Sequence, residues 1–353
     1  MERYDVAVVG LGALGSGAAY QAAVKGARVI GFEQFELGHV RGASHDTSRI
    51  VRTSYGSPEF VGLARSAYRD WADLEKRSGL NLLDITGGVV FLPQGGPTPS
   101  SDFTKSLGAN GVLYELLDSR EVNRRWPGFN FSRWDRCRAV TTMQYQARAH
   151  GAVLREKTCV DQVIPDGDGV LLETSKGQVR ADKVILAADA WINKLLRPLG
   201  AEIPLTVMQE QVTYFKPADP ALFEPERFPV WIWGGEKWFY GFPTYGEPTI
   251  KAGQDAQQNL MAPETRTFVP SPEVFQTLKD HMDVIIPGHG QDVRTVTCPI
   301  QRHPNIFIAL SNGLAFKFAP AIGRVAAELA IDGKTSDDIT KFPVPTPAGP
   351  SKL

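Results

Sequence analysis

Cysteine is scarce in this chain, and that scarcity excludes two kinds of stabilisation. The 353 residues include three cysteines, Cys137, Cys159 and Cys298, an odd number with no C-x-x-C pair. We therefore expect neither a disulfide framework nor a structural zinc site. Ligand spacings such as H-E-x-x-H are also missing, so we predict no metal.

The chain also lacks an excess of one charge and any long apolar run. Its formal net charge is -1, which gives no general attraction to nucleic acid or to an acidic membrane. No apolar run is long enough to span a bilayer, and no cationic segment precedes an apolar one at the N-terminus. We therefore expect neither a membrane span nor a signal peptide.

The N-terminal segment has the clearest structural pattern, a β-α-β unit. The apolar run YDVAVV precedes GLGALG, an Ala-rich helix follows, and a second strand ends at Glu33. In this G-x-G-x-x-G spacing Gly10 allows a tight turn, Gly12 lets the backbone approach a pyrophosphate, and Gly15 lets the helix pack on the strand. The helix N-terminus would face the phosphates, and Glu33 can accept from ribose hydroxyls. The unit predicts dinucleotide binding, but its spacing leaves NAD and FAD open.

A polar and basic loop follows Glu33 in place of a second crossover helix. It is the stretch GHVRGASHDTSRIVRTSYG, residues 38–56. Most of its polar side chains are close together: His45, Asp46, Thr47, Ser48, Arg49 and Arg52. Its position beside the predicted cofactor indicates a site, although a solvated loop has the same composition.

Several segments resemble the sarcosine oxidase and N-methyltryptophan oxidase family, in the family's order and along nearly the whole chain. They are GASHDTSRIVR with SPEFVGLARSAYRDWADLEKRSG, KVILAADAWINKLLRPLG, WFYGFPTYGEPTIKAG and SNGLAFKFAPAIGRVAAELAIDGKTSDDI. The resemblance implies an FAD-dependent oxidase of small secondary amines that carry a carboxylate, such as N-methyl or cyclic amino acids. In that reaction a hydride passes to the flavin, oxygen becomes hydrogen peroxide, and the imine hydrolyses. We expect a monomer.

The resemblance also implies how FAD is held. Cys298 matches the cysteine that the family joins to the flavin, and His45 and Arg49 match flavin-facing residues that assist the attachment. A thiolate is the nucleophile in such a linkage, so basic neighbours would help. The residues alone leave another possibility open, because Cys298 lies between a β-prone run and a Pro-containing turn and a free cysteine is most often a buried core residue.

Residues for the substrate and for oxygen follow from the same resemblance. Arg52 and Lys317 match the family's carboxylate-binding pair, and arginine can bind a carboxylate bidentately. Lys317 precedes a helix whose positive N-terminal end would stabilise reduced flavin, although it could also be an ordinary exposed lysine. Tyr240 matches a tyrosine of the substrate cavity, and Lys251 matches a lysine whose charge would stabilise superoxide. The candidate catalytic residues are thus Lys251, Arg49, His45 and Tyr240.

These patterns predict an α/β fold of two interleaved domains. A Rossmann-like FAD-binding domain would take residues 1–80, 138–200 and 293–340, and a substrate domain with a mixed β-sheet, of α+β type, would take residues 81–137 and 201–292. Within them we expect a helix with Ser57 as N-cap that ends before Gly79. We also expect a hairpin in PVWIWGGEKWFYGFP.

The last residues, 341–353, read as a flexible tail. It closes with Ser351-Lys352-Leu353, which has the form of the peroxisomal import signal. We therefore expect binding by the peroxisomal import receptor and location in the peroxisome, where oxidases that release hydrogen peroxide are housed.

The chain departs from the family pattern in ways that leave alternatives open. After Cys298 a family tyrosine, a turn and a strand have no counterpart, and after RWPGF a loop and a strand with paired glycines are missing. Asp255 replaces a family histidine and would add negative charge where an anionic substrate arrives, which disfavours sarcosine itself. The alternatives are a pipecolate or fructosyl-amino-acid oxidase, a truncated flavin-binding protein without turnover, and an NAD-linked dehydrogenase, which only the glycine motif favours.

Overall fold

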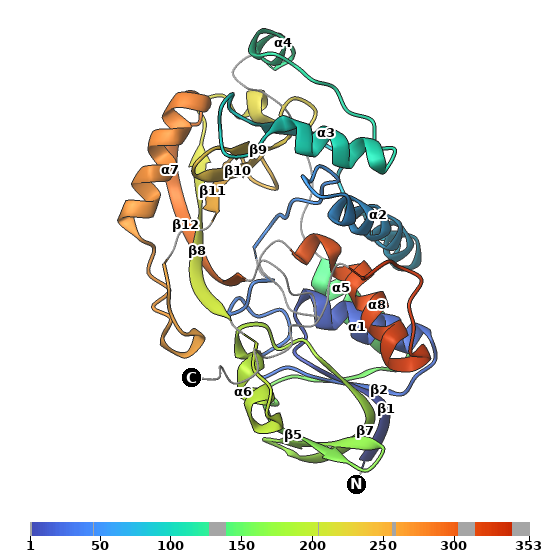
Figure 1. The fold of residues 1–353 in the computed structure, drawn as a ribbon. Coiled ribbons are helices and arrows are strands. Elements are labelled where there is room, and N and C mark those ends of the chain that lie inside the picture. Colours follow the sequence, from blue (N-terminus) through green and yellow to red (C-terminus); the bar gives the residue numbers. More distant parts are fainter. Residues whose placement is uncertain are drawn as a thin grey trace, which may run out of the picture.

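The computed structural model describes residues 2–44, 46–126, 139–203, 205–255, 259–302 and 315–340, with the backbone alone at 139–141, 206 and 297–302. Two six-stranded sheets lie towards opposite ends of the molecule, and α1, α2, α5 and α8 lie to one side between them (Figure 1). The predicted α/β class with a second, mixed sheet is confirmed. His45, Cys137 and residues 341–353 lie outside the described residues.

The first sheet contains the predicted β-α-β unit. Its strand order is β4-β2-β1-β7-β6-β5. β1 pairs in parallel with both β2 and β7, β2 pairs in parallel with β4, and β5, β6 and β7 pair antiparallel. The strands are β1 (Glu2–Val9), β2 (Val29–Phe32), β4 (Val153–Arg155), β5 (Val160–Asp166), β6 (Gly169–Thr174) and β7 (Gly177–Leu186).

The helices beside this sheet pack closely because they meet at glycines. A Cβ on Gly17 of α1 would lie 2.6 Å from the carbonyl oxygen of Ala319, at the start of α8. A Cβ on Gly323 of α8 would overlap the backbone of Gly17. The two helix backbones are therefore in contact, and the start of α8 lies close to the N-terminal half of α1.

The helix limits agree with the capping signals where these exist. α2 begins at Pro58 after Ser57 and is followed by Gly79, which has a φ of 70°, as predicted. The α-helices are α1 (Ala13–Val24), α2 (Pro58–Ser78), α3 (Ser100–Ala109), α4 (Ser119–Arg125), α5 (Ala139–Ala149), α6 (Ile192–Leu196), α7 (Pro272–Ile285) and α8 (Ala319–Asp332). Short 3-10 turns occupy Asp189–Trp191, Arg197–Leu199, Pro220–Phe223, Pro263–Thr265 and Ala315–Phe318.

The second sheet has the order β12-β8-β11-β10-β9-β3 and is antiparallel except for the β3–β9 pair. α7 covers one face, where Leu278, Met282 and Ile286 pack against Phe215 and Trp231. The predicted hairpin is present as β9 and β10. The strands are β3 (Gly88–Phe91), β8 (Thr206–Lys216), β9 (Val230–Gly234), β10 (Trp238–Phe242), β11 (Ile250–Asp255) and β12 (Gln291–Arg302).

β12 differs from what its sequence suggests. The strand continues through Cys298 and Pro299 to Arg302, where a turn is expected from the proline. A proline is tolerated here because β12 is an edge strand of the sheet. Its pairing with β8 also places residues 293–302 in the second sheet, although the predicted boundaries assign them to the cofactor domain. The domain boundaries themselves stay a prediction.

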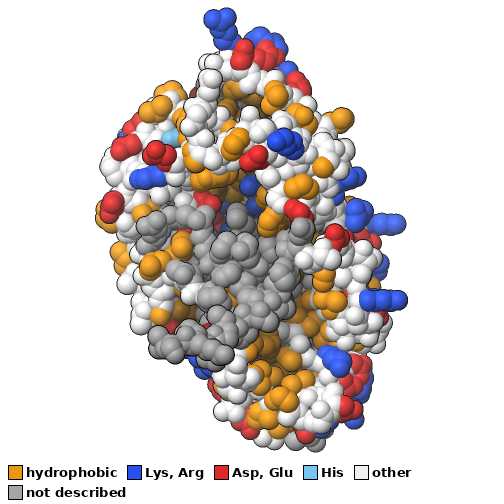
Figure 2. Space-filling view, in the orientation of Figure 1, with side chains coloured by type: hydrophobic (Ala, Val, Ile, Leu, Met, Phe, Trp, Pro, Cys, Tyr) orange, Lys and Arg blue, Asp and Glu red, His pale blue; other side chains and the backbone are white. Residues whose placement is uncertain are grey.

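The face drawn in Figure 2 has no strong charge bias. Acidic and basic side chains are interspersed over the face drawn in Figure 2. No helix in the part of the chain that the structure describes is long and apolar enough to cross a membrane.

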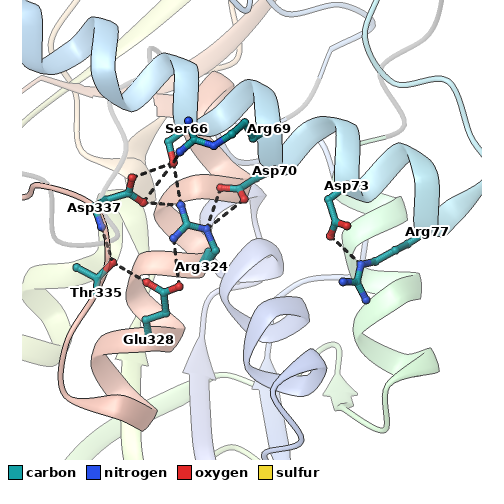
Figure 3. Close-up of polar contacts among 9 residues, drawn as sticks. All are labelled: Ser66, Arg69, Asp70, Asp73, Arg77, Arg324, Glu328, Thr335 and Asp337. Atoms are coloured by element: carbon teal, nitrogen blue, oxygen red, sulfur yellow. Dashed lines mark hydrogen bonds and ion pairs between the residues drawn. The ribbon is translucent and has the colours of Figure 1, made fainter.

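Arg324 of α8 ties this helix to α2 and to the segment that follows it (Figure 3). Its Nε donates to both carboxylate oxygens of Asp70 at 3.1 Å, and its other nitrogens donate to Glu328 at 3.1 Å, to Ser66 at 2.8 Å and to Asp337. Burial raises the pKa of Asp70 above its ordinary value although Arg324 acts against that shift. One guanidinium therefore compensates three largely buried carboxylates.

We predict that Arg324→Met lowers the free energy of unfolding by about 3–5 kcal/mol, because it leaves buried carboxylates without their counterion. Urea unfolding near neutral pH measures the change. The matched control is Arg77→Met on α2, whose pair with Asp73 leaves both side chains 43% exposed and contributes at most about 1 kcal/mol. Equal losses in the two variants would contradict the central place of Arg324.

Candidate functional site: a loop between two cavities

The glycine turn after β1 is shaped by close backbone packing. Gly10 has a φ of 92°, and a Cβ there would overlap the carbonyl oxygen of Ala187 at the end of β7. A Cβ on Gly15 would overlap the carbonyl oxygen of Gly10. At Gly12, by contrast, an added Cβ would approach only Ser44, at 3.0 Å. Gly10 and Gly15 are thus required by packing, whereas the backbone at Gly12 borders open space.

A first cavity of about 270 Å³ lies against this turn, and Gly10, Gly12 and Glu33 are among its lining residues. Glu33 is 6% exposed, and its carboxylate accepts from the backbone N–H of Leu11 at 3.0 Å and of Phe35 at 3.1 Å. Burial acts to raise the pKa of Glu33, but hydrogen bonds from His39 and from these N–H groups outweigh it and lower the pKa. The cavity therefore has an ionised acceptor next to a glycine turn at a helix N-terminus, which suits a dinucleotide.

A second cavity, of about 1380 Å³, lies between α2, α3 and the strands β3 and β9. Arg49 and Arg52 are among its lining residues, together with Phe242 of β10. The polar loop of residues 38–56 borders both cavities, because Ser44 and Asp46 line the first cavity and Arg49 and Arg52 line the second. The loop that the sequence singles out is therefore the wall shared by the two cavities.

Lys251 of β11 fixes this loop to the second sheet. Its Nζ donates to Oδ2 of Asp46 at 2.9 Å and to the carbonyl oxygen of Ser48 at 2.7 Å. Tyr214 of β8 donates to the other oxygen of Asp46, and its hydroxyl lies 2.8 Å from that of Thr47. The loop is thus held at three consecutive residues by two strands of the second sheet.

The Lys251–Asp46 pair is buried and electrostatically strong. The side chains are 4% and 10% exposed, and Nζ of Lys251 also lies 4.0 Å from the centre of the Phe242 ring. Burial acts to raise the pKa of Asp46, but Lys251 and Tyr214 outweigh it and lower the pKa to about 2. Asp46 is therefore ionised at neutral pH, and Lys251 has a fixed counterion beside the first cavity.

Arg52 and Lys317 lie together, as the resemblance implies. Both cations approach the ring of Tyr55, with Arg52 Cζ 4.2 Å and Lys317 Nζ 5.7 Å from its centre. Burial, with Arg52 and Arg49 nearby and Asp255 acting against them, lowers the pKa of Lys317 well below its ordinary value. Burial also lowers the pKa of Arg52. The charged form of Lys317 is thus disfavoured in the free protein, and an anionic group bound beside Lys317 and Arg52 would stabilise it.

The position of Lys317 corrects one alternative. It is 5% exposed and lies in the 3-10 turn before α8, so it is not an ordinary exposed lysine. Trp71 of α2 donates to its carbonyl oxygen at 2.9 Å, which holds the turn beside α2.

The remaining predicted residues are distributed less simply. Arg49 donates to the carbonyl oxygen of Ala43 and lies over the ring of Phe316 at 5.4 Å. Tyr240 packs with Ile50 and Phe242, and among the described residues it is not part of the lining of either cavity. The backbone of Cys298 lies opposite Glu210 of β8, but its side chain, like the whole of His45, is outside the described residues.

Tyr55 and Tyr214 are site residues that the sequence reasoning missed. Tyr55 lies within the polar loop, so its position beside Arg52 was a usable signal. Tyr214 lies on β8 in a run of mostly buried residues, and nothing local in the sequence separates it from a core tyrosine. The described residues contain no group of three or more His, Cys, Asp or Glu side chains placed to hold a metal ion.

Comparison with known proteins agrees with this geometry. Residues 5–329 match the family described as FAD dependent oxidoreductase. The chain belongs to this family. It is 30% identical to the monomeric sarcosine oxidase of Bacillus sp. (strain B-0618), over 98% of this chain and 96% of that protein. It is 27% identical to the peroxisomal sarcosine oxidase of Homo sapiens, over 96% and 95%, and other relatives are named N-methyl-L-tryptophan oxidase.

A solved structure supports the fold over nearly the full length. NikD, described as an unusual amino acid oxidase essential for nikkomycin biosynthesis, superposes with a TM-score of 0.82 at 26% identity, covering 97% of both chains. The protein is thus an FAD-dependent amine or amino-acid oxidase of the sarcosine oxidase family. The predicted NAD-linked alternative is wrong.

The alignment with the Bacillus relative also bears on the missing segments. It extends over 382 positions, more than the 353 residues of this chain, so the relative contains residues that have no counterpart here.

We predict that Asp46→Asn lowers the free energy of unfolding by about 2–4 kcal/mol at pH 6, because it leaves a buried ammonium without its counterion. The pKa of Asp46 is about 2 in the folded protein against an ordinary value of 3.8, so its stabilisation is present above about pH 4 and lost as the pH falls towards 2. Urea unfolding at several pH values should therefore show a difference that narrows below pH 4.

The control for this prediction is Asp182→Asn, which removes the exposed partner of Arg3 and should change stability by at most about 1 kcal/mol. A difference between wild type and Asp46→Asn that stays constant down to pH 3 would show that the ionised carboxylate is not its source.

Proposed function

We propose that this protein oxidises a secondary amine that carries a carboxylate, such as an N-methyl or cyclic amino acid. The observation that supports the proposal most strongly is the pair Arg52 and Lys317, two buried basic side chains that both lie near the ring of Tyr55. A carboxylate bound beside them would favour the charged form of Lys317 and would fix the position of the substrate, including its amine. Arg52 also lines the larger cavity, which is open to a small molecule.

The residues of the first cavity fit FAD. A Cβ at Gly12 would narrow the space in front of the turn, and Glu33 provides an ionised acceptor for sugar hydroxyls. The chemistry that bound FAD supplies is acceptance of a hydride and transfer of the electrons to oxygen, which gives hydrogen peroxide and leaves an imine to hydrolyse. Arg52 and Lys317 would bind and orient the substrate. Lys251 places a buried positive charge next to Asp46, which lines the first cavity.

The charge on Lys251 supports a role with oxygen. A buried ammonium stabilises negative charge that develops near it, as happens when oxygen is reduced to superoxide. Asp46 partly compensates this charge, but it also fixes the position of the ammonium. Tyr240 packs edge-to-face with Phe242, the ring that Lys251 contacts, and so we assign it a positioning role within the same wall.

Asp255 supports a substrate other than sarcosine. It lies at the end of β11 and acts electrostatically on both Arg52 and Lys317. An additional carboxylate near the cation pair weakens the attraction for a small anion and favours a substrate with further groups to bind.

We predict hydrogen peroxide production with N-methyl amino acids in a peroxidase-coupled assay. Arg52→Met should raise KM by about 10- to 100-fold for a carboxylate substrate, because hydrogen bonds to charged groups contribute about 1.5–3 kcal/mol each. The methyl ester of the same substrate has no carboxylate, so its KM with the wild-type enzyme should be higher than that of the acid. Arg52→Met should change the KM for the ester little. Arg65→Met, on the exposed side of α2, is the control that should leave KM unchanged.

The same peroxide assay distinguishes two other candidate functions. Peroxide from fructosyl amino acids but not from N-methyl or cyclic amino acids would favour a fructosyl-amino-acid oxidase. A protein with a normal flavin spectrum and no peroxide from any of these amines would be a flavin-binding protein without turnover, which the residues missing relative to the Bacillus enzyme favour.

We further propose that FAD is joined covalently to Cys298, on the strength of the family resemblance. Acid precipitation should leave the pellet yellow for wild type and for Cys159→Ala, whose half-buried thiol also lines the first cavity, and should release the colour from Cys298→Ala. Release of the flavin from wild type would show that the linkage is absent.

The tail supports one further assignment. Import into peroxisomes through Ser351-Lys352-Leu353 stays a prediction, and removal of these three residues would test it. The name of the human relative, peroxisomal sarcosine oxidase, is consistent with this prediction.

A further inference from the structure

Asp189 occupies an unusual position beside the glycine turn. It follows β7 as the first residue of the 3-10 turn Asp189–Trp191, and its φ is 44°, in the left-handed region that non-glycine residues rarely adopt. The two residues before it lie directly against the turn, since a Cβ on Gly10 would overlap the carbonyl oxygen of Ala187 and lie 3.1 Å from Cα of Ala188. The strained backbone therefore places a carboxyl group at the cavity that the glycine turn borders.

One oxygen of the Asp189 carboxyl group lacks a hydrogen bond in the part of the chain that the structure describes. Asp189 lines the first cavity, and its Oδ1 is buried without a hydrogen-bond partner among the described residues. Burial raises the pKa of Asp189 to about 7. A buried polar atom without a partner is rare in folded proteins and commonly marks a place where a ligand completes the hydrogen bonding.

Among the residues whose side chains the structure describes, the charged groups around Asp189 do not provide a counterion for it. Glu33, directly after β2, lines the same cavity and is itself negative. Lys194 of α6 also lines the cavity, but its ammonium lies 3.8 Å from the carboxylate of Asp161 of β5 and pairs with it. His39, from the loop, is engaged with Glu33. β12 packs against the 3-10 turn, and its charged residue at that end is Arg302, of which the backbone is described.

We propose that Asp189 binds FAD as a neutral carboxylic acid, so that FAD affinity falls as the pH rises. The glycine turn suits the negatively charged pyrophosphate, and an ionised Asp189 in the same cavity would repel it. In the protonated form the group loses its charge and gains an O–H donor for an oxygen of the cofactor. At a pH where free Asp189 is ionised, each FAD that binds is accompanied by the uptake of one proton from solvent. The inference does not depend on the identity of the amine substrate.

The test uses the full chain with Cys298→Ala, so that FAD binding is reversible, and follows flavin fluorescence between about pH 6 and 9. The Kd for FAD should be flat below about pH 7 and rise about tenfold per pH unit above it. Asp189→Asn is neutral, has an N–H donor and tolerates the left-handed backbone, so its Kd should stay flat and be about 100-fold lower than that of the parent at pH 9. Asp161→Asn, the control carboxylate, should follow the parent.

A pH dependence of Kd in Asp189→Asn equal to that of the parent would overturn the proposal, as would a parent Kd that does not change up to pH 9. If Asp189→Asn does not fold, calorimetry of FAD binding to the parent at pH 8 in two buffers of different ionisation enthalpy decides the matter. Uptake of close to one proton per FAD is expected, and absence of uptake would overturn the proposal.

Discussion

Lys251 and Asp46 form the buried ion pair that joins the polar loop to the second sheet, and the site depends on it. The loop contributes Ser44 and Asp46 to the cavity at the glycine turn and Arg49 and Arg52 to the larger cavity. Without a fixed loop, these side chains would have no defined positions relative to one another. A buried pair is costly to form unless its hydrogen bonds are complete. Here the Ser48 carbonyl accepts from Lys251, and the Tyr214 hydroxyl and the backbone N–H of Thr47 donate to Asp46.

The two cavities present different buried charged groups. The first has the carboxylate of Glu33, held ionised by N–H donors, beside a turn that a pyrophosphate fits. The second is bordered by Arg52, and Lys317 lies beside it as a second buried cation. The Glu33 carboxylate and the basic side chain of Arg52 thus line different cavities, as the proposed roles in cofactor and substrate binding need.

Contacts between helices α1, α2 and α8 determine the position of Lys317. Gly17 and Gly323 bring α1 and α8 into backbone contact, which sets the start of α8 near the glycine turn. Arg324 and Trp71 then hold α8 and the preceding 3-10 turn against α2. Lys317 is therefore held in a buried position, in the 3-10 turn before α8.

The sequence by itself determined the β-α-β unit, the limits of α2 and the β9–β10 hairpin, because each depends on local rules of turn, capping and alternation. It also indicated the polar loop, because a cluster of charges at that place is unusual. The tertiary structure alone decided that Lys251 pairs with Asp46, that Lys317 is buried, and that β12 continues through Pro299 on a sheet edge. These outcomes depend on contacts between residues as much as 265 positions apart, as with Arg52 and Lys317, and no local pattern encodes such distances.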